Sequence, residues 1–465
     1  MTRADRSQLP QVGPDPSFTF PTIVGHTLSN GLRVRTLEHH SVPLVTFVMQ
    51  VDGGSGADAA GREGVAAMTA DMVDEGTGAL SAIDVSEALA RIGAEYDVDV
   101  GADATVFTLT TLARFAERGS SVLADLLTRP SLRGEDFDRV RQLRLDRLRQ
   151  LKDLPPAVAE RAFLRLLYGD HPYGHLSIGN DAALRRIDLH DVTTFHATTF
   201  RPSRSALVVA GAMSHEGLLR LAEDAFGHWA DGDGGGAVVP VAAADLEPAT
   251  APPRLVVVSR EGAAQSELRI GHLSARRDTP DYVSLVVMNA VLGGQFVSRV
   301  NLKLREEKGY TYGARTGFDW RRGLAPFVLQ ASVHTAATAD SIRDSLNELE
   351  AIRGSRPPSD SEMSLAKASL TRGYPRNFET AHQVARSVAQ LVLYGLPDSY
   401  FENFVPRVNA VTADDVTRAA QTYLDPARVT TLIVGDYAAI GPSLDALGLG
   451  DVQVQAPDVT DAGPS

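Results

Sequence analysis

The feature that most constrains the fold of this chain is an internal repeat between its two halves. Residues 191–211 read DVTTFHATTFRPSRSALVVAG, and residues 415–435 read DVTRAAQTYLDPARVTTLIVG. The two segments align without a gap, and the shared positions are the pairs Asp191 and Asp415, Pro202 and Pro426, Arg204 and Arg428, and Gly211 and Gly435. Such a repeat predicts a duplicated α+β domain, in which each copy of this segment is a helix, a short connector and a sheet strand.

Length and local composition suggest where the two copies begin and end. A chain of 465 residues is long for one domain. A stretch rich in Gly, Ala and Pro predicts an interdomain linker, and the Pro-rich N-terminus reads as a tail. The expected parts are a tail at 1–20, an N-terminal domain at 21–230, the linker at 231–252, a C-terminal domain at 253–448 and a second tail at 449–465. We expect each domain to be a mainly antiparallel sheet with helices packed on one face.

Composition excludes several classes of function. The net charge of −13 disfavours a nucleic-acid-binding surface. The chain has no cysteine, so disulfides, cysteine-ligated zinc and thiol catalysis are excluded. No apolar run is long enough for a membrane span, and the N-terminus lacks the apolar region of a signal peptide. We therefore expect a cytoplasmic protein, and the alternative is a periplasmic protein whose signal peptide has been removed.

No motif of a self-sufficient active site is found. The sequence contains no Gly-x-Ser-x-Gly elbow and no phosphate-binding loop, and residues 53–56 form a glycine-rich turn without a following lysine. The histidines His39, His40, His171 and His175 are interpreted as surface or capping residues.

Four motifs, taken together, resemble one known family. The segments NGLRVRTLEHHSVP, GVAAMTADMVDEGT, GDHPYG and LGGQFVSRVNLKLREEKGYTYGA occur in that order across both halves. They are similar to the processing-peptidase branch of the pitrilysin/insulysin/mitochondrial-processing-peptidase family of inverted-zincin metallopeptidases. The resemblance runs from about residue 22 to about residue 445. It implies that this chain is one half of a clamshell, which closes with a second chain around a chamber.

The zinc motif of that family is degenerate in this chain. Active members carry His-x-x-Glu-His on the helix that corresponds to residues 64–75, and a Glu on a later helix completes the site. Here Ala67 and Asp71 stand at the two His positions, Ala70 stands at the position of the base, and Arg147 stands at the position of the later Glu. Methyl groups cannot bind a metal, and a guanidinium repels a cation. We therefore expect no metal and no other cofactor in this chain, and we expect the neighbouring carboxylates to be solvated: Asp71, Asp74 and Asp146.

The second half retains a different part of the family's catalytic centre. In the family, an Arg in a Leu-Arg-Glu context and a Tyr seven residues later reach the zinc site, and Arg305 and Tyr312 match these two positions. The resemblance implies that both side chains stabilise the transition state of a partner's reaction in trans. Gly293 and Gly294 permit an unusual backbone path and are predicted to contact substrate.

The same segment carries a helical pattern. Phe296, Val297, Val300 and Leu304 fall at helical spacing, which predicts a helix that runs through Arg305.

These observations give a working hypothesis. The chain would be the non-catalytic subunit of a heterodimeric zinc metallopeptidase, with zinc in a homologous partner subunit and a peptide or unfolded polypeptide as substrate. Two alternatives remain open, a purely structural scaffold and a stand-alone peptide-binding protein of the same fold. The Arg305 and Tyr312 pair argues against a scaffold, which does not need it.

Overall fold

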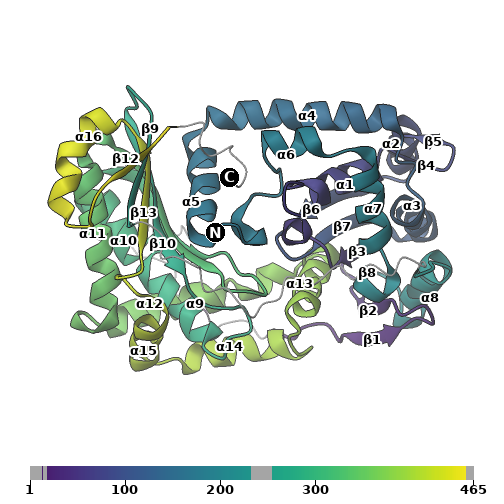
Figure 1. The fold of residues 1–465 in the computed structure, drawn as a ribbon. Helices are drawn as coiled ribbons and strands as arrows, with labels where there is room; N and C mark the ends of the chain where they lie inside the picture. The colour runs from purple at the N-terminus through teal and green to yellow at the C-terminus, as the bar shows by residue number, and fades with distance from the viewer. Residues whose placement is uncertain (1–12, 14–17, 232–253, 457–465) are drawn as a thin grey trace, which may run out of the picture.

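Each half of the chain forms one six-stranded sheet in a computed structural model that describes residues 13, 18–231 and 254–456 (Figure 1). The first sheet has the order β1-β2-β8-β3-β7-β6, with strands β1 (Val24–Thr27), β2 (Arg33–Glu38), β3 (Leu44–Val51), β6 (Glu95–Val100), β7 (Thr105–Leu112) and β8 (Ser205–Gly211). The second has the order β11-β12-β10-β13-β9-β14, with strands β9 (Leu255–Ser259), β10 (Gln265–Leu273), β11 (Thr311–Phe318), β12 (Pro326–His334), β13 (Thr430–Gly435) and β14 (Gln453–Gln455). A short hairpin of β4 (Gly76–Thr77) and β5 (Leu80–Ser81) stands apart from both sheets.

Five strands of each sheet share one topology. In the first, β2 pairs in parallel with β8, and β8, β3, β7 and β6 then follow in antiparallel order. In the second, β9 pairs in parallel with β13, and β13, β10, β12 and β11 follow in antiparallel order. The duplicated α+β fold predicted from the repeat is therefore confirmed. Strand β14 lies in the range assigned to the C-terminal tail, which thus adds a strand beside β9.

The helices of the two halves follow a similar order along the chain. Those of the first half are α1 (Val65–Val73), α2 (Ala82–Arg91), α3 (Ala116–Thr128), α4 (Gly134–Lys152), α5 (Pro155–Tyr168), α6 (Asp181–Arg186), α7 (Leu189–Thr199) and α8 (His215–Phe226). Those of the second half are α9 (Tyr282–Leu292), α10 (Arg299–Asn301), α11 (Thr338–Glu350), α12 (Asp360–Arg372), α13 (Ala381–Tyr394), α14 (Tyr400–Ala410), α15 (Ala413–Tyr423) and α16 (Tyr437–Leu444). Short helical segments are η1 (Ser55–Ala57), η2 (Ala113–Phe115), η3 (Pro172–Gly174), η4 (Pro202–Arg204), η5 (Leu302–Glu307), η6 (Thr335–Ala337), η7 (Ala351–Ser355), η8 (Tyr374–Phe378) and η9 (Asp445–Leu447). None of the helices in the described ranges combines the length and the apolar character needed to cross a membrane.

The repeated aspartates have the same role in both halves. Asp191 closes a capping box with Asp188 at the start of α7, and Asp415 closes one with Thr412 at the start of α15. In each case the side chain accepts a hydrogen bond from the N-cap backbone, which satisfies an amide left free at the helix start. Each helix leads to the central strand β8 or β13, as the repeat predicts. The predicted linker at 231–252 lies outside the described residues except for Asp231.

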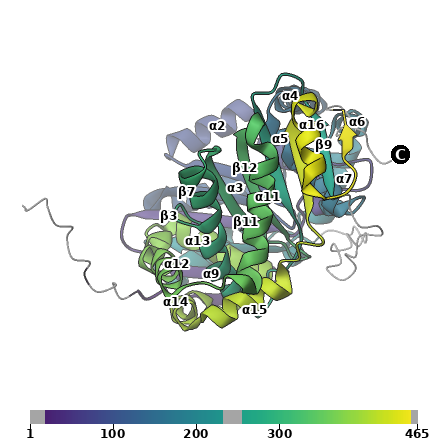
Figure 2. The same cartoon turned by 90° about the vertical axis from the view of Figure 1, so that its left-hand side faces the viewer.

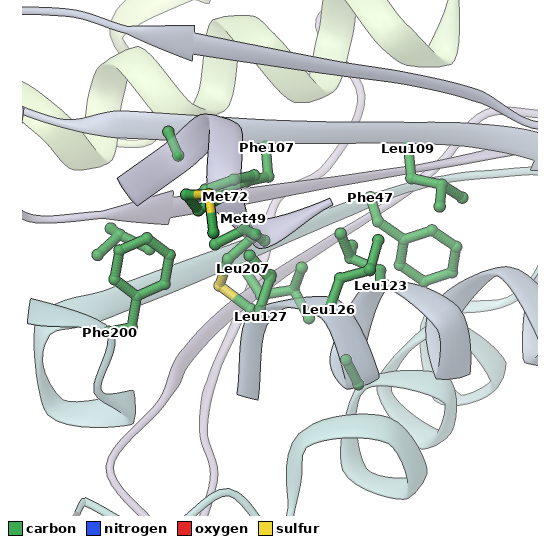
Figure 3. Close-up of a cluster of buried hydrophobic side chains, with 14 of the residues drawn as sticks. Phe47, Met49, Met72, Phe107, Leu109, Leu123, Leu126, Leu127, Phe200 and Leu207 are labelled. Atoms are coloured by element: carbon green, nitrogen blue, oxygen red, sulfur yellow. The ribbon is translucent and has the colours of Figure 1, made fainter. Parts of the chain in front are cut away.

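One face of each sheet is covered by helices of its own half. In the first half, the side chains packed in this core come from the strands, α1, α3 and the end of α7 (Figure 3): Phe47, Met49, Met72, Phe107, Leu109, Leu123, Leu126, Leu127, Phe200 and Leu207. In the second half, α11 lies over β12 (Figure 2) and buries Ile342 and Leu349 against the sheet. These cores confirm the predicted arrangement of helices against each sheet.

The opposite face of each sheet is covered by a helix from the other half, which the sequence did not predict. Helix α13 of the second half packs Val384 and Val388 against Val48 and Val208 of the first sheet. Helix α5 of the first half packs in the same way against the second sheet, where Val158, Phe163 and Leu167 meet Val256, Val258 and Leu432. Figure 1 shows α5 beside the second sheet and α13 beside the first. The two halves are thus interlocked rather than merely joined.

Charged side chains of the loop between β11 and β12 connect the two halves. Arg322 Nη2 lies 2.8 Å from Asp52 Oδ1, and the Arg322 backbone amide donates to Asp103 Oδ2 at 2.9 Å. The buried Arg321 guanidinium lies 4.9 Å from the centre of the Tyr173 ring, and the Tyr173 hydroxyl hydrogen-bonds Asp103. The loop therefore fixes the orientation of the second half relative to the first.

An ion pair between a buried arginine and a half-buried glutamate anchors the segment that carries Arg305. The Arg299 side chain, 4% exposed, makes a two-pronged contact with Glu362 of α12, at 2.6 Å and 2.9 Å. It also donates to the carbonyls of Arg356 and Pro357. The Arg299 hydrogen bonds are the main cause that lowers the pKa of Glu362 to about 2.

This pair leads to a prediction about stability. Glu362→Gln should lower the free energy of unfolding by about 2–3 kcal/mol near neutral pH, because it leaves a buried guanidinium without its counter-charge. The folded-state pKa of Glu362 lies below its ordinary value of 4.5. The stabilisation is therefore complete above about pH 5 and is lost as the pH falls toward 2, so the two proteins should converge in acid.

Urea unfolding at several pH values measures this difference. The control is Glu216→Gln on α8, where an exposed pair with Arg220 should contribute less than about 1 kcal/mol. Equal losses in the two variants would contradict the role assigned to the Arg299 and Glu362 pair.

Candidate functional site

Helix α1 carries the degenerate zinc motif, and a buried carboxylate holds its first turn. Gly64 precedes the helix with a φ of 104°, a conformation that favours glycine. Asp58 accepts hydrogen bonds from the amides of Gly64 at 2.6 Å and Ala66 at 2.8 Å. His175 Nε2 lies 2.9 Å from the same carboxylate, and burial is the main influence that raises the pKa of Asp58. The helix is therefore positioned by contacts that do not involve a metal.

His171 and His175 flank the Pro-Tyr-Gly turn and have different roles. His171 Nδ1 accepts a hydrogen bond from the Tyr173 amide and caps η3, which confirms the capping interpretation. His175 does more than cap a turn, because its ring is half-buried and pairs with Asp58 beneath α1.

The degenerate positions on α1 are mostly buried. Ala67 and Ala70 lie in the core beside the sheet. Asp71 is exposed, and its carboxylate pairs with Arg144 Nη1 of α4 at 2.5 Å. Arg147, one turn further along α4, is exposed and hydrogen-bonds Gln150 at 3.3 Å. The helix is thus intact, while one ligand position holds an engaged carboxylate and another holds a cation.

A cavity of about 490 Å³ brings three of the four degenerate positions together. Ala70, Asp71 and Arg147 line it, and Ala67 does not. The edge strand β6 forms one wall, through Tyr96, Asp97 and Val98. No group of three His, Asp or Glu side chains within the described ranges is arranged to hold a metal ion. The residues present therefore do not fit zinc, since two offer only methyl groups and a third is a guanidinium.

Asp74 in this cavity differs from its prediction. It was expected to be a solvated carboxylate, but it is half-buried at the C-terminal end of α1, where a negative charge is unfavourable. Burial, followed by the charges of Glu75 and Asp71, raises its pKa to about 6. The Tyr96 hydroxyl that also lines the cavity has no hydrogen-bond partner within the described chain, and burial raises the pKa of Tyr96. Sequence spacing gave no signal for either feature.

The paired glycines in the second half are explained by close packing. A Cβ at Gly293 would lie 2.4 Å from Thr316 Oγ1, and one at Gly294 would lie 2.5 Å from Asn289 Nδ2. The Thr316 amide also donates to the Gly293 carbonyl at 3.0 Å, which joins the end of α9 to β11. Neither glycine has a positive φ, so close approach rather than an unusual backbone path requires them. Their contact with substrate stays a prediction.

The helix predicted from Phe296 begins later than expected. It starts at Arg299 and continues as the wider turn η5, in which Val300 and Leu304 are buried as predicted. Phe296 is 58% exposed and Val297 is also exposed, so both stand before the helix. Their spacing matched a helical pattern, but they belong to a loop that ends at α10.

Arg305 is half-buried and held in place. Its guanidinium carbon lies 4.4 Å from the centre of the Phe296 ring, and its Nε lies 3.5 Å from Glu306. Stacking on an aromatic ring limits the directions that the guanidinium can adopt. The exposed Phe296 therefore serves as a platform for Arg305.

Tyr312 is 88% exposed and lies in a bulge of the edge strand β11. The pairing with β12 gains one extra residue between Thr311 and Ala314. The Thr311 hydroxyl holds this bulge by donating to the Ser332 carbonyl at 2.7 Å, and Asn301 Oδ1 accepts from the Ala314 amide at 3.0 Å. Bulges re-aim the side chains that they carry, and this bulge directs Tyr312 into solvent.

The structure does not bring the two sets of predicted residues together within one chain. The cavity belongs to α1, α4 and β6 of the first half, whereas Arg305 and Tyr312 belong to the second half (Figure 1). Within the described residues, no hydrogen bond or ion pair connects either side chain to the cavity.

Both halves of the chain match models of the same peptidase family. Residues 33–180 match the family described as Insulinase (Peptidase family M16), and residues 186–370 match the domain described as Peptidase M16 inactive domain. An uncharacterized zinc protease of Mycobacterium tuberculosis is 25% identical over 407 residues, 86% of this chain and 90% of the relative. The mitochondrial-processing peptidase subunit beta of Lentinula edodes is 24% identical over 416 residues, 86% of each chain.

Solved structures share the architecture. A peptidase M16 inactive domain from Pseudomonas fluorescens has a TM-score of 0.80 at 22% identity, covering 89% of this chain and 98% of that one. A protease from Helicobacter pylori has a TM-score of 0.82 at 19% identity, covering 90% of this chain and all of that one. Since both halves match in order, and the fold agrees over nearly the whole length, the chain belongs to the M16 peptidase family.

Proposed function

We propose that this chain is the non-catalytic subunit of a heterodimeric zinc peptidase that cleaves peptides or unfolded polypeptides. The observation that carries the proposal is the contrast between two parts of the chain. The positions of a zinc site on α1 and α4 hold alanines, an engaged aspartate and an arginine. In contrast, the half-buried Arg305 is held by Phe296, and the exposed Tyr312 is held by a β-bulge. A homologous partner would supply zinc and the base. The relative named as a beta subunit of a processing peptidase supports an assembly of several subunits.

Arg305 and Tyr312 are suited to stabilise an oxyanion in the partner's site. A peptide carbonyl under attack gains negative charge, and a guanidinium and a phenol hydroxyl are both strong hydrogen-bond donors. Because the two side chains are positioned before any substrate arrives, little reorganisation is needed during the reaction. Tyr312 is exposed and Arg305 is partly exposed, so a second chain can reach both side chains.

The edge strand β6 offers a way to hold an extended substrate. It is the last strand of the first sheet, and it passes the cavity beside α1. The exposed side chains alternate along it as Glu95, Asp97 and Asp99, and Arg386 of α13 pairs with Asp99 at 3.0 Å. A peptide that adds a strand to this edge would gain backbone hydrogen bonds without depending on its sequence.

The first prediction concerns assembly. Co-expression with a relative that carries an intact His-x-x-Glu-His motif should give a stable one-to-one complex that binds about one zinc ion and hydrolyses unfolded peptides. Native mass spectrometry and elemental analysis measure the composition. The chain alone should bind no stoichiometric zinc and should be inactive. Zinc or peptidase activity in the isolated chain, or failure to bind any zinc-bearing relative of its own genome, would count against the proposal.

The second prediction concerns Tyr312. In the active complex, Tyr312→Phe should lower kcat by about 100- to 1,000-fold and change KM much less, because the hydroxyl acts mainly in the transition state. Arg305→Lys should also lower kcat, since the fork geometry of the guanidinium is lost.

The matched control for this experiment is Tyr310→Phe. Tyr310 lies on the same segment but packs against the core of the second half. That variant should keep its turnover, and native mass spectrometry should show that all variants assemble. Unchanged turnover in Tyr312→Phe on several peptides would favour the alternative of a structural scaffold.

The third prediction tests the metal-free state of the cavity without an activity assay. The folded state raises the pKa of Asp74 from 3.8 to about 6, so ionised Asp74 destabilises the fold above that pH. Asp74→Asn should therefore raise the free energy of unfolding by about 1–2 kcal/mol near pH 8 and have little effect near pH 4.

Thermal unfolding of the isolated chain at the two pH values measures this effect. The control is Asp138→Asn on α4, where an exposed pair with Arg141 should give no gain at either pH. A resident cation in the cavity would hold Asp74 in its ionised form, and the variant would then lose stability near pH 8 instead of gaining it.

A further inference from the structure

A buried arginine in the second half lacks the partner that a buried charge usually has. Arg277 is 8% exposed, and none of the carboxylates in the described ranges forms an ion pair with it. Its Nη2 donates to the Tyr400 hydroxyl at 3.0 Å. Its guanidinium carbon lies 3.5 Å, 5.2 Å and 5.5 Å from the ring centres of Tyr282, Tyr400 and Tyr394.

Other buried arginines of this half are paired. Arg299 binds Glu362, Arg269 binds Glu267 at 2.5 Å, and Arg321 binds Asp319 at 2.7 Å. A desolvated contact with an aromatic ring contributes about 2 kcal/mol, but it supplies no counter-charge. An uncompensated guanidinium therefore indicates a site for an anion rather than a structural ion pair.

Arg277 forms part of the wall of a cavity of about 480 Å³ between α14 and the segment that joins β10 to α9. Helices α9 and α14 lie side by side there (Figure 1). The lining also includes Asp278, Leu396, Pro397, Tyr400, Pro406 and Arg407. This volume is within the range of pockets that bind small molecules.

The charges around the cavity favour an anion. Arg407 is exposed and adds a second guanidinium, with no ion pair to any described residue. The one carboxylate of the lining, Asp278, is already held by Arg276 through two contacts of 3.1 Å. The Tyr400 hydroxyl accepts from Arg277, which leaves its own proton to donate, and burial raises the pKa of Tyr400 to about 12. The cavity thus offers several hydrogen-bond donors, and its one carboxylate is already paired.

We propose that this cavity binds a small organic anion, with its carboxylate or phosphate group on Arg277, Tyr400 and Arg407. The guanidinium fork matches both oxyanions, because each presents two oxygens at the spacing of its N–H groups. The apolar side chains of Leu396, Pro397 and Pro406 suit the carbon body of such a ligand. Arg305 and Tyr312 do not line the cavity, so this site is separate from the proposed catalytic contribution.

Isothermal titration calorimetry of the full-length chain with benzoate, and separately with inorganic phosphate, tests the proposal. At least one of the two should bind saturably with one site per chain, and added salt should weaken the binding. Tighter binding of benzoate would identify a carboxylate with an apolar body, and tighter binding of phosphate would identify a phosphate group.

Three variants test whether the anion binds in this cavity, and a fourth variant is the control. Arg277→Gln should abolish it, and Arg407→Gln and Tyr400→Phe should each raise the Kd by about tenfold, as expected for loss of a hydrogen bond to a charged group. The control Arg220→Gln removes an exposed arginine of α8 and should leave the Kd unchanged.

The variants also determine which results overturn the proposal. Arg407 is exposed, so Arg407→Gln is informative even if Arg277→Gln does not fold. Absence of saturable binding for both anions would overturn the proposal. Unchanged binding in both Arg407→Gln and Tyr400→Phe, or an equal loss in Arg220→Gln, would overturn it as well.

Discussion

The packing of each sheet against a helix from the other half is the constraint on which the rest of the structure depends. The central strands of both sheets are buried on two faces, and exposed apolar faces of this size are not stable in water. Helix α13 covers Val48 and Val208 of the first sheet, and helix α5 covers Val256 of the second. Neither half could bury both of its faces alone. The duplication therefore gives an interlocked pair, and the β11–β12 loop with Arg322 fixes how the two halves face each other.

This packing also explains how the fold is kept although the residues at the predicted ligand positions do not fit zinc. Helix α1 is held by Met68 and Met72 in the core and by the Asp58 carboxylate at its first turn. None of these contacts uses the ligand positions. Ala67 and Ala70 lie on the buried face of the helix, and Arg144 neutralises Asp71. Fold and chemistry reside in different residues of one helix, so the chemistry can be lost while the fold is kept.

Much of the architecture could be predicted from local sequence. The repeat predicted two related domains, and the helix, connector and strand of each copy follow from Asp191 and Asp415 at their capping positions. The packing of α5 and α13 against the sheet of the opposite half could not be predicted. It joins residues that are far apart in the sequence, and it produces no periodic pattern in the sequence. Phe296 and Val297 were misassigned for a related reason: their spacing fits a helix, but spacing alone does not tell a buried face from an exposed loop.

Only part of the candidate site could be predicted from the sequence. The degenerate positions and the Arg305 and Tyr312 pair were found by resemblance, which fixes residues in the chain but not their surroundings. The raised pKa of Asp74 depends on burial together with two neighbouring charges, and the orientation of Tyr312 depends on a bulge held by Asn301. Arg277 gave no sequence signal, since its lack of a carboxylate partner is a property of tertiary packing.

The separation of the two residue sets within one chain has a consequence for the proposed assembly. In the proposed assembly, two chains of this fold would close on each other, and each of two centres would combine the first half of one chain with the second half of the other. The residues at positions 67, 70, 71 and 147 would then affect only the centre to which this chain contributes its first half. The other centre would receive Arg305 and Tyr312 from this chain. A subunit without a metal site would therefore still be required for the activity of its partner, because each centre would be divided between two chains.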